Sequence, residues 1–476
     1  MGAGSPRPND RGFAAASLAL IAAGMAAAAF RLGRESLWLD ETYTWWFAQL
    51  GWDEMLRAAR LDAVNPPLYY LLVRLLTGGS PAVEAALRAP SVAAHGLGIA
   101  AAILIGRSLG GRPGAIAAGL LWATHPLTLW AARDARPYAL AASLAAVATA
   151  AFLRFRTTSS AGAAAIAVVA LAAGLLTHYF YFVLAAALAL LALLDLRHAP
   201  GVFRRWTTLT LAATLPLAAW LAWFFSSGAT SLGIGWIRTP VLPDLPATAW
   251  NLASGYAGVL DIPSTFFGVA VVALILSGLR RASPSVPLLG AGIVAPLFAV
   301  WIISQRRAVY VDRYFVVLMP FVAGAVAVGA GRLWSSLRRG TSSRWLVLGA
   351  FVAATSASTV FVAPKFAKED WRGLADYLRS AGAQSASLAL SEPELALPLS
   401  TYYEPGFLKT ARPSPSRCTS GCWFVYRQPY TATHAMTQSV SEPRPRPSPV
   451  LPDGCAVGSR WESPTGIGVW RIACEP

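Results

Sequence analysis

The sequence predicts an α-helical protein that crosses a membrane many times and ends in a small external α/β domain. Of its 476 residues, 55% are hydrophobic and only 13% are charged, with a mean hydropathy of +0.50. Apolar runs of roughly membrane-spanning length recur from residue 12 to residue 363, after which the composition becomes polar and rich in proline. A chain this apolar and this poor in charge is not expected to form a soluble globule.

The net charge of +16 comes mainly from arginines that cluster between the apolar runs. In a soluble protein this charge would suggest nucleic acid, whereas arginines in this arrangement are typical of membrane topology. We therefore expect membrane lipids among the partners and no nucleic acid.

The first apolar run, Gly12–Phe30, has 19 uncharged residues and is long enough to span a bilayer at about 1.5 Å per residue. Its length and the lack of a clear cleavage context favour an uncleaved anchor over a signal peptide, with the N-terminus inside. Residues 31–79 then form the first external loop. Within it, Trp52–Leu61 is amphipathic and Pro66–Thr77 is too short to cross, so both are predicted to be juxtamembrane helices.

Ten further spans are predicted, which makes about eleven in all. Arginines in alternate loops then lie on the side of the N-terminus, as the positive-inside rule requires, and the odd number places the C-terminal segment outside. Only Thr177-His178-Tyr179 divides the fifth from the sixth span, and reading them as one helix would conflict with the arginine pattern. The ten spans are Val83–Arg107, Pro113–Trp130, Pro137–Leu153, Ala161–Thr177, Tyr179–Leu194, Trp206–Ser227, Ile262–Leu279, Val286–Ser304, Tyr314–Arg332 and Trp345–Ala363.

The change of composition predicts two domains, a transmembrane domain over residues 1–363 and an external α/β domain over residues 364–476. The second contains a predicted helix at Glu369–Ser380 and several short β-rich runs. All four cysteines fall there, which favours two disulfides in an oxidising compartment. A zinc site is the alternative, but the spacing lacks the paired CxxC rhythm of common zinc ribbons. The disulfide candidates are Cys418, Cys422, Cys455 and Cys474.

Two adjacent carboxylates, Asp40 and Glu41, follow the first span in the stretch SLWLDETYTWW. A carboxylate at the membrane surface is costly to desolvate unless it is paired or used, which makes this pair a candidate catalytic centre. The structural alternative is that the pair caps and charges the first turn of an interfacial helix.

Other unusual residues gather at the external ends of the predicted spans. Arginine should be scarce on that side, so an external group of arginines indicates an anionic partner. Structural alternatives are arginines that anchor lipid headgroups, a histidine that ends a helix and aromatic rings that form an interfacial belt. The predicted substrate-binding residues are Asn65, Tyr69, Arg88, Arg133, Arg136, Tyr138, His178, Tyr179, Arg306, Arg307, Arg313 and Tyr314.

Four motifs occur in order: WLDETYTW, NPPLYYLL, LRAPS and ARDARPYAL. Together they resemble the GT-C glycosyltransferases of the protein O-mannosyltransferase (family 39) and aminoarabinose-transferase group, and in particular the bacterial RgtA/B/C/D-like branch. The resemblance covers roughly residues 12–335, and the C-terminal domain has no counterpart in it.

The resemblance implies transfer of a sugar (mannose, arabinose or another glycosyl group) from a polyprenyl-phosphate donor to an acceptor hydroxyl on a glycan, lipid or protein. Asp40 matches the catalytic acidic residue of the family's first loop and would act as general base, with Glu41 beside it. Asp134 lies where relatives carry a second acidic residue. Since the donor already carries a phosphate leaving group, a single displacement would invert the anomeric carbon. The departing phosphate gains negative charge and would need cationic partners, a role that suits Arg136, Arg313 and Arg88.

The rival function is a transporter or flippase for lipid-linked sugars. Transporters place polar residues near the bilayer midplane and often have pseudo-symmetric halves, whereas here the charges gather at external span ends and the halves differ. An O-antigen-ligase-like or polymerase enzyme is a third alternative, against which the position of Asp40 argues.

No cofactor is expected, and no nucleotide-binding glycine loop is present in the sequence. A divalent metal held by Asp40 and Glu41 is an alternative to the metal-free mechanism that the resemblance implies. The expected location is the cytoplasmic (inner) membrane, with the active site and the C-terminal domain on the external, periplasmic side.

Overall fold

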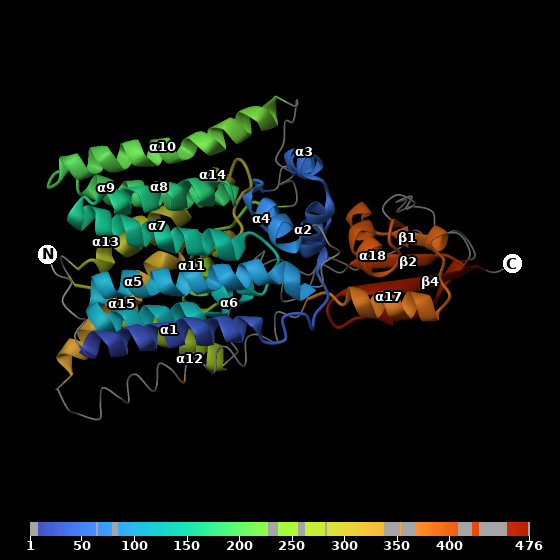
Figure 1. The fold of residues 1–476 in the computed structure, drawn as a ribbon. Coiled ribbons are helices and arrows are strands. Elements are labelled where there is room, and N and C mark those ends of the chain that lie inside the picture. The colour runs from blue at the N-terminus through green and yellow to red at the C-terminus, as the bar shows by residue number, and fades with distance from the viewer. Residues whose placement is uncertain are drawn as a thin grey trace. The chain divides into compact units, whose positions relative to one another are not determined.

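The computed structural model describes residues 8–62, 65–78, 84–226, 237–255, 262–280, 283–337, 353, 368–407, 421–427 and 455–474. These residues form many helices and one four-stranded sheet (Figure 1). The chain divides into two compact units. The helical unit comprises residues 1–30, 52–72 and 88–364, and the mixed unit comprises residues 31–51, 73–87 and 365–476. Packing thus groups residues 31–51 and 73–87, from the first external loop and its borders, with the residues from 365 onward.

Most of the helical unit consists of apolar helices, and α7, α8 and α10 lie next to one another in Figure 1. The C-terminal part of α4 and the N-terminal part of α5 belong to the mixed unit. The elements of the helical unit are α1 (Pro8–Ala29), α3 (Trp52–Asp62), α4 (Leu68–Thr77), α5 (Glu84–Thr124), α6 (Pro126–Ala132), α7 (Tyr138–Thr158), α8 (Ala161–Leu175), η1 (Tyr179–Tyr181), α9 (Phe182–Leu194), α10 (Pro200–Phe225), α11 (Asp244–Ser254), α12 (Ile262–Gly278), α13 (Ser285–Leu289), η2 (Gly290–Val294), α14 (Ala295–Ser304), η3 (Asp312–Leu318) and α15 (Met319–Ser336).

Among the described residues, six helices are long and apolar enough to cross a membrane: Arg11–Ala29, Glu84–Thr124, Tyr138–Thr158, Pro200–Phe225, Ser285–Ser304 and Asp312–Ser336. Shorter apolar helices accompany them, including Ala161–Leu175 and Tyr179–Leu194, which are separate as predicted. The protein is thus a multi-pass membrane protein. The expected total of eleven spans stays a prediction, since Trp345–Ala363 lies, apart from residue 353, outside the described residues.

Helix α5 contains the second and third predicted spans in 41 residues with a sharp break between them. Gly111 adopts φ 64° and ψ −155°, a conformation that only glycine reaches easily, and Pro113 follows it. The two arms then meet closely, because a Cβ at Gly106 would lie 2.3 Å from the carbonyl oxygen of Gly114. The third predicted span also ends early: His125 caps a new helix, α6, which contains Trp130.

The mixed unit is built around the sheet, whose strand order is β1-β2-β4-β3. Strand β1 runs parallel to β2, and the other neighbours are antiparallel. Helix α17 lays Trp371, Leu374 and Leu378 over one face of the sheet, against Val425 and Val469. The predicted α/β architecture of the C-terminal domain is confirmed, and its external location stays a prediction. The elements are α2 (Leu39–Gln49), α17 (Trp371–Ser380), η5 (Ser385–Ser387), β1 (Leu388–Leu390), η6 (Pro393–Leu395), α18 (Ala396–Tyr402), β2 (Trp423–Arg427), β3 (Cys455–Glu462) and β4 (Ile467–Cys474).

Three of the four cysteines, Cys422, Cys455 and Cys474, lie on or beside this sheet. Cys422 and Cys455 are both disulfide-bonded, and Cys455 stands opposite Cys474 in the β3–β4 register. Cys418 and the side chain of Cys474 lie outside the described residues, so the pairing stays a prediction.

Candidate active site

The two predicted catalytic carboxylates of the first loop lie in the first turn of α2, within the mixed unit. Glu41 is fully buried, and one of its oxygens lies 2.6 Å from the ammonium of Lys368, which is itself only 3% exposed. Its other oxygen accepts a hydrogen bond from the backbone N–H of Trp38, 3.3 Å away. Asp40 is partly exposed. Adjacent residues on a helix point about 100° apart, so the two carboxylates meet different surroundings.

A third acidic residue, Glu369, contacts the same turn from the C-terminal domain. Its carboxylate accepts hydrogen bonds from the backbone N–H of Leu39 (3.0 Å) and from the indole N–H of Trp371 (2.8 Å), and it forms a buried ion pair with Arg427. Burial alone would lower the pKa of Arg427, but the carboxylates of Glu369 and Asp40 outweigh it and raise that pKa above its ordinary value. Asp40 therefore lies within the electrostatic reach of Arg427.

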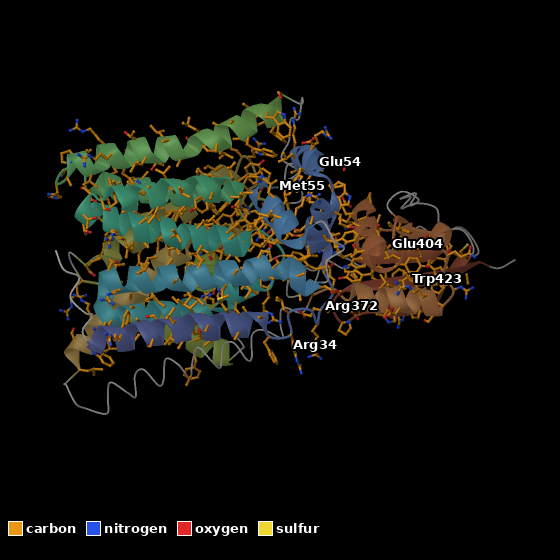
Figure 2. All side chains as sticks on the ribbon, viewed as in Figure 1. Arg34, Glu54, Met55, Arg372, Glu404 and Trp423 are labelled. Carbon is orange, nitrogen blue, oxygen red and sulfur yellow. The ribbon has the colours of Figure 1, made fainter. Side chains whose placement is uncertain are left out.

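The extended segment before α2 is fixed to the same domain. Ser36 donates a hydrogen bond to the carbonyl of Glu369 (2.6 Å), and the hydroxyl of Tyr402 accepts one from the N–H of Leu37 (2.6 Å). Arg372 donates to the carbonyl of Arg34 (2.6 Å), and both residues are labelled in Figure 2. Sequence reasoning missed Lys368, Glu369 and Arg427. One signal was available for Lys368, because the chain has only three lysines and otherwise uses arginine.

A second group of predicted residues meets in the helical unit, and we call Arg136, Tyr138, His178, Arg313 and Tyr314 the arginine–aromatic cluster. They come from the α6–α7 turn and the start of α7, from the α8–η1 turn, and from η3. The guanidinium carbon of Arg313 lies 5.5 Å from the ring centroid of Tyr138 and 5.8 Å from that of Tyr314. The ring of His178 lies 4.8 Å from that of Tyr314 and 5.6 Å from that of Tyr138. Both arginines are 4% exposed.

The two arginines of this cluster affect the pKa of its histidine, His178. Burial, together with the charges of Arg136 and Arg313, lowers the pKa of His178 to about 3. Its Nδ1 accepts a hydrogen bond from the N–H of Phe180 (3.1 Å) and so caps η1. His178 is therefore neutral at physiological pH, and the potential around it is positive.

The third predicted catalytic residue, Asp134, is fully buried in the α6–α7 turn. Its backbone carbonyl accepts a hydrogen bond from the hydroxyl of Ser91 (2.7 Å), which in turn contacts the hydroxyl of Tyr69 (2.8 Å). Arg88 is 1% exposed on α5, and the amide of Asn65 donates to the hydroxyl of Tyr70 (3.4 Å). These contacts fix the polypeptide next to the arginine–aromatic cluster.

Four other predicted substrate-binding residues lie elsewhere in the helical unit. Arg133 donates to the carbonyls of Ala28 (3.1 Å) and Phe30 (2.7 Å). Its side chain thereby caps the C-terminal end of α1. The hydroxyl of Tyr179 accepts from the indole of Trp220 (2.9 Å). Arg306 and Arg307 are exposed in the turn after α14.

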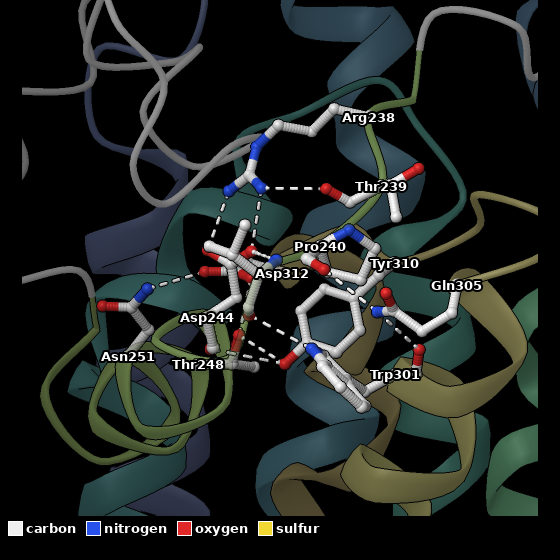
Figure 3. A network of polar contacts seen from close by, with 11 residues as sticks. Arg238, Thr239, Pro240, Asp244, Thr248, Asn251, Trp301, Gln305, Tyr310 and Asp312 are labelled. Carbon is white, nitrogen blue, oxygen red and sulfur yellow. Dashed lines mark hydrogen bonds and ion pairs between the residues drawn. The ribbon is translucent and has the colours of Figure 1, made fainter.

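A network of polar contacts around two buried carboxylates joins α11 to the start of η3 (Figure 3). Arg238 makes two hydrogen bonds, of 2.7 and 2.8 Å, to Asp244 at the start of α11. Asp312 accepts hydrogen bonds from Thr248 (2.6 Å) and Asn251 (2.8 Å) of α11. Because Asp312 directly precedes Arg313, these bonds fix the start of η3 and thereby the backbone that carries the Arg313 guanidinium.

Metal binding finds no support in the described part of the chain, where no group of three or more His, Cys, Asp or Glu side chains is placed to hold an ion. The alternative is a divalent metal held by Asp40 and Glu41 together, but Glu41 is already paired with Lys368. The metal-free mechanism stays a prediction.

The fold has counterparts among solved structures. It is similar to ArnT from Cupriavidus metallidurans in two crystal structures. The apo state matches with a TM-score of 0.57 at 12% identity, and the form bound to undecaprenyl phosphate matches with a TM-score of 0.54 at 14% identity; each match covers 96% of this chain and 97% of ArnT. No protein-family model matches the sequence, and no curated protein matches it either.

Proposed function

We propose that this protein is a membrane glycosyltransferase that moves a sugar from a polyprenyl-phosphate donor to an acceptor hydroxyl on the outer side of the cytoplasmic membrane. The observation that carries the proposal is the arginine–aromatic cluster, where two buried guanidiniums create a positive potential around a neutral histidine. Such a potential suits a phosphate, and ArnT, which shares the fold, has been crystallised with undecaprenyl phosphate.

Each proposed role follows from the chemistry of the transfer. Arg136 and Arg313 hold the donor phosphate and stabilise the charge it gains as it leaves. Tyr138 and Tyr314 offer ring faces to the apolar side of the sugar. Asp40 takes the proton of the acceptor hydroxyl while the new C–O bond forms at the anomeric carbon and the bond to the phosphate oxygen breaks, so that the product is inverted. Glu41 is assigned a structural role by its buried ion pair with Lys368.

Binding of undecaprenyl phosphate to the purified protein tests the cluster. Each of Arg136→Ala and Arg313→Ala should weaken binding about ten- to a hundredfold, because losing a charge-assisted contact costs roughly 1.5–3 kcal/mol. Arg205→Ala removes an exposed arginine from α10 of the same unit and serves as the matched control, with parent-like binding expected. If all three variants bind like the parent, the cluster is not the phosphate site.

A further inference from the structure

The N-terminus of α2 has its backbone donors satisfied mainly by a domain more than three hundred residues away in sequence. The first N–H groups of a helix lack partners within the helix and need others. Here the N–H of Leu39, the first residue of α2, donates to Glu369, while the N–H groups of the two residues before the helix donate to Tyr402 (from Leu37) and to Glu41 (from Trp38). Two of these three acceptors belong to the C-terminal domain. The first turn of α2 is therefore shaped by that domain within the mixed unit.

Two buried ion pairs lie at the same place. The pair Lys368–Glu41 has side-chain exposures of 3% and 0%, and the pair Arg427–Glu369 has exposures of 10% and 4%. A buried ion pair contributes little net stability, but removal of one partner leaves a charge that the interior cannot solvate. The remaining carboxylate must then take up a proton or move towards water. Since Glu41 follows Asp40 directly on α2, its movement would change the direction of the Asp40 side chain.

The cations of the two ion pairs act on different carboxylates of α2. Lys368 contacts Glu41 and holds the face of α2 that turns inward. Arg427 contacts Glu369 and also lies within the electrostatic reach of Asp40. The C-terminal domain thus contributes one cation to the buried carboxylate of the first loop and a second cation near the partly exposed one.

We propose that Lys368 and Arg427 are positioning residues of the transferase, and that the C-terminal domain is the support that sets the conformation of the first loop around Asp40. This inference rests on the proposed function, with Asp40 as the base. It predicts that the domain is required for turnover even if it never touches the donor.

A double-mutant cycle on the full-length protein tests this inference. The variants are Lys368→Met, Glu41→Gln and the double variant, measured for thermal unfolding in detergent and for turnover of radiolabelled polyprenyl-phosphate sugars. We expect Lys368→Met to lower kcat at least tenfold with little change in the KM for the donor. The double variant leaves no unpaired buried charge, so it should recover most of both the unfolding temperature and kcat.

Two further variants serve as controls. Lys368→Arg keeps the charge and should retain more activity than Lys368→Met. Arg460→Met removes an exposed arginine from β3 and should change neither measurement.

The possible failures can be told apart. If the parent transfers no sugar from any donor tried, the proposed function itself fails. If the parent is active and Lys368→Met matches it in kcat, the positioning role fails alone. A double variant that regains its unfolding temperature but stays inactive would also overturn the inference, because Glu41 would then be needed for the reaction itself.

Discussion

Asp40 and Glu41 are adjacent carboxylates that differ in burial and in the charges around them. Glu41 is buried against Lys368, whereas Asp40 remains partly exposed within reach of Arg427. A carboxylate that must accept a proton from a substrate has to be reachable, which Asp40 is and Glu41 is not. Burial, and not chemical identity, therefore separates the proposed base from the proposed structural residue.

Substitution of Asp40 measures this difference. Asp40→Asn keeps the shape and the capping ability of the side chain but cannot take a proton, so turnover of radiolabelled donor should fall by roughly 10²–10⁴-fold while donor binding survives. Full transfer by a folded Asp40→Asn protein would restore the helix-cap interpretation. Transport of the intact donor across a vesicle membrane would then be the next property to measure, since a flippase needs no base.

At the scale of elements, the helical unit depends on glycines where helix backbones touch. A Cβ at Gly329 of α15 would lie 1.8 Å from the carbonyl oxygen of Leu274 in α12, and one at Gly110 of α5 would lie 2.0 Å from the carbonyl oxygen of Ala327 in α15. Small residues let helices in membranes approach this closely, which maximises van der Waals contact between them. Helix α15 carries η3 and hence Arg313 at its N-terminal end, so this packing also places the cluster.

Helix contact at Gly329 can be tested by adding one methyl group. Gly329→Ala should push α12 and α15 apart and destabilise the protein by about 1–3 kcal/mol, the usual range for overpacking. The readout is the temperature of thermal unfolding in detergent. Gly201→Ala on α10 meets open space and should leave that temperature unchanged or slightly raised. Equal behaviour of the two variants would contradict the close contact.

For the whole molecule, the chain order and the packing units do not coincide. The chain leaves the helical unit after residue 30, enters the mixed unit, returns at residue 52, and repeats the exchange at residues 73 and 88. The C-terminal domain completes the mixed unit from residue 365 onwards. Residues 31–51 and 73–87 therefore form one compact unit with the C-terminal domain.

Membrane topology follows from this arrangement. Since residues 31–51 of the first loop and the C-terminal domain pack together, both must lie on the same side, and the arginine pattern predicts that this side is external. An alkaline phosphatase fused after Pro476 should be active and a green fluorescent protein at the same place should be dark. Fusions after Ser159 should show the reverse. Cytoplasmic behaviour of the Pro476 fusion would move the proposed active site to the other side of the membrane.

Much of the fold could be predicted from the sequence, because the signals involved are local. Whether a segment crosses a bilayer depends on its own length and hydropathy, so the apolar runs and the separate α8 and α9 could be identified one at a time. The break at Gly111 had a local signal as well, in the Gly-Gly-Arg-Pro sequence between two spans. The four motifs carried the GT-C resemblance for the same reason, since each lies within a short stretch.

Only the tertiary structure decided which of these residues meet. Glu41 and Lys368 are 327 residues apart, and Arg136 and Arg313 approach the same histidine from different helix ends. Sequence reasoning selected Asp40, Arg136, His178 and Arg313 but not Lys368 or Arg427, which look like ordinary surface charges when taken alone. Their burial and pairing depend on how all the helices and the sheet pack. The free energy of such a contact is set by desolvation at a place that exists only in the folded chain.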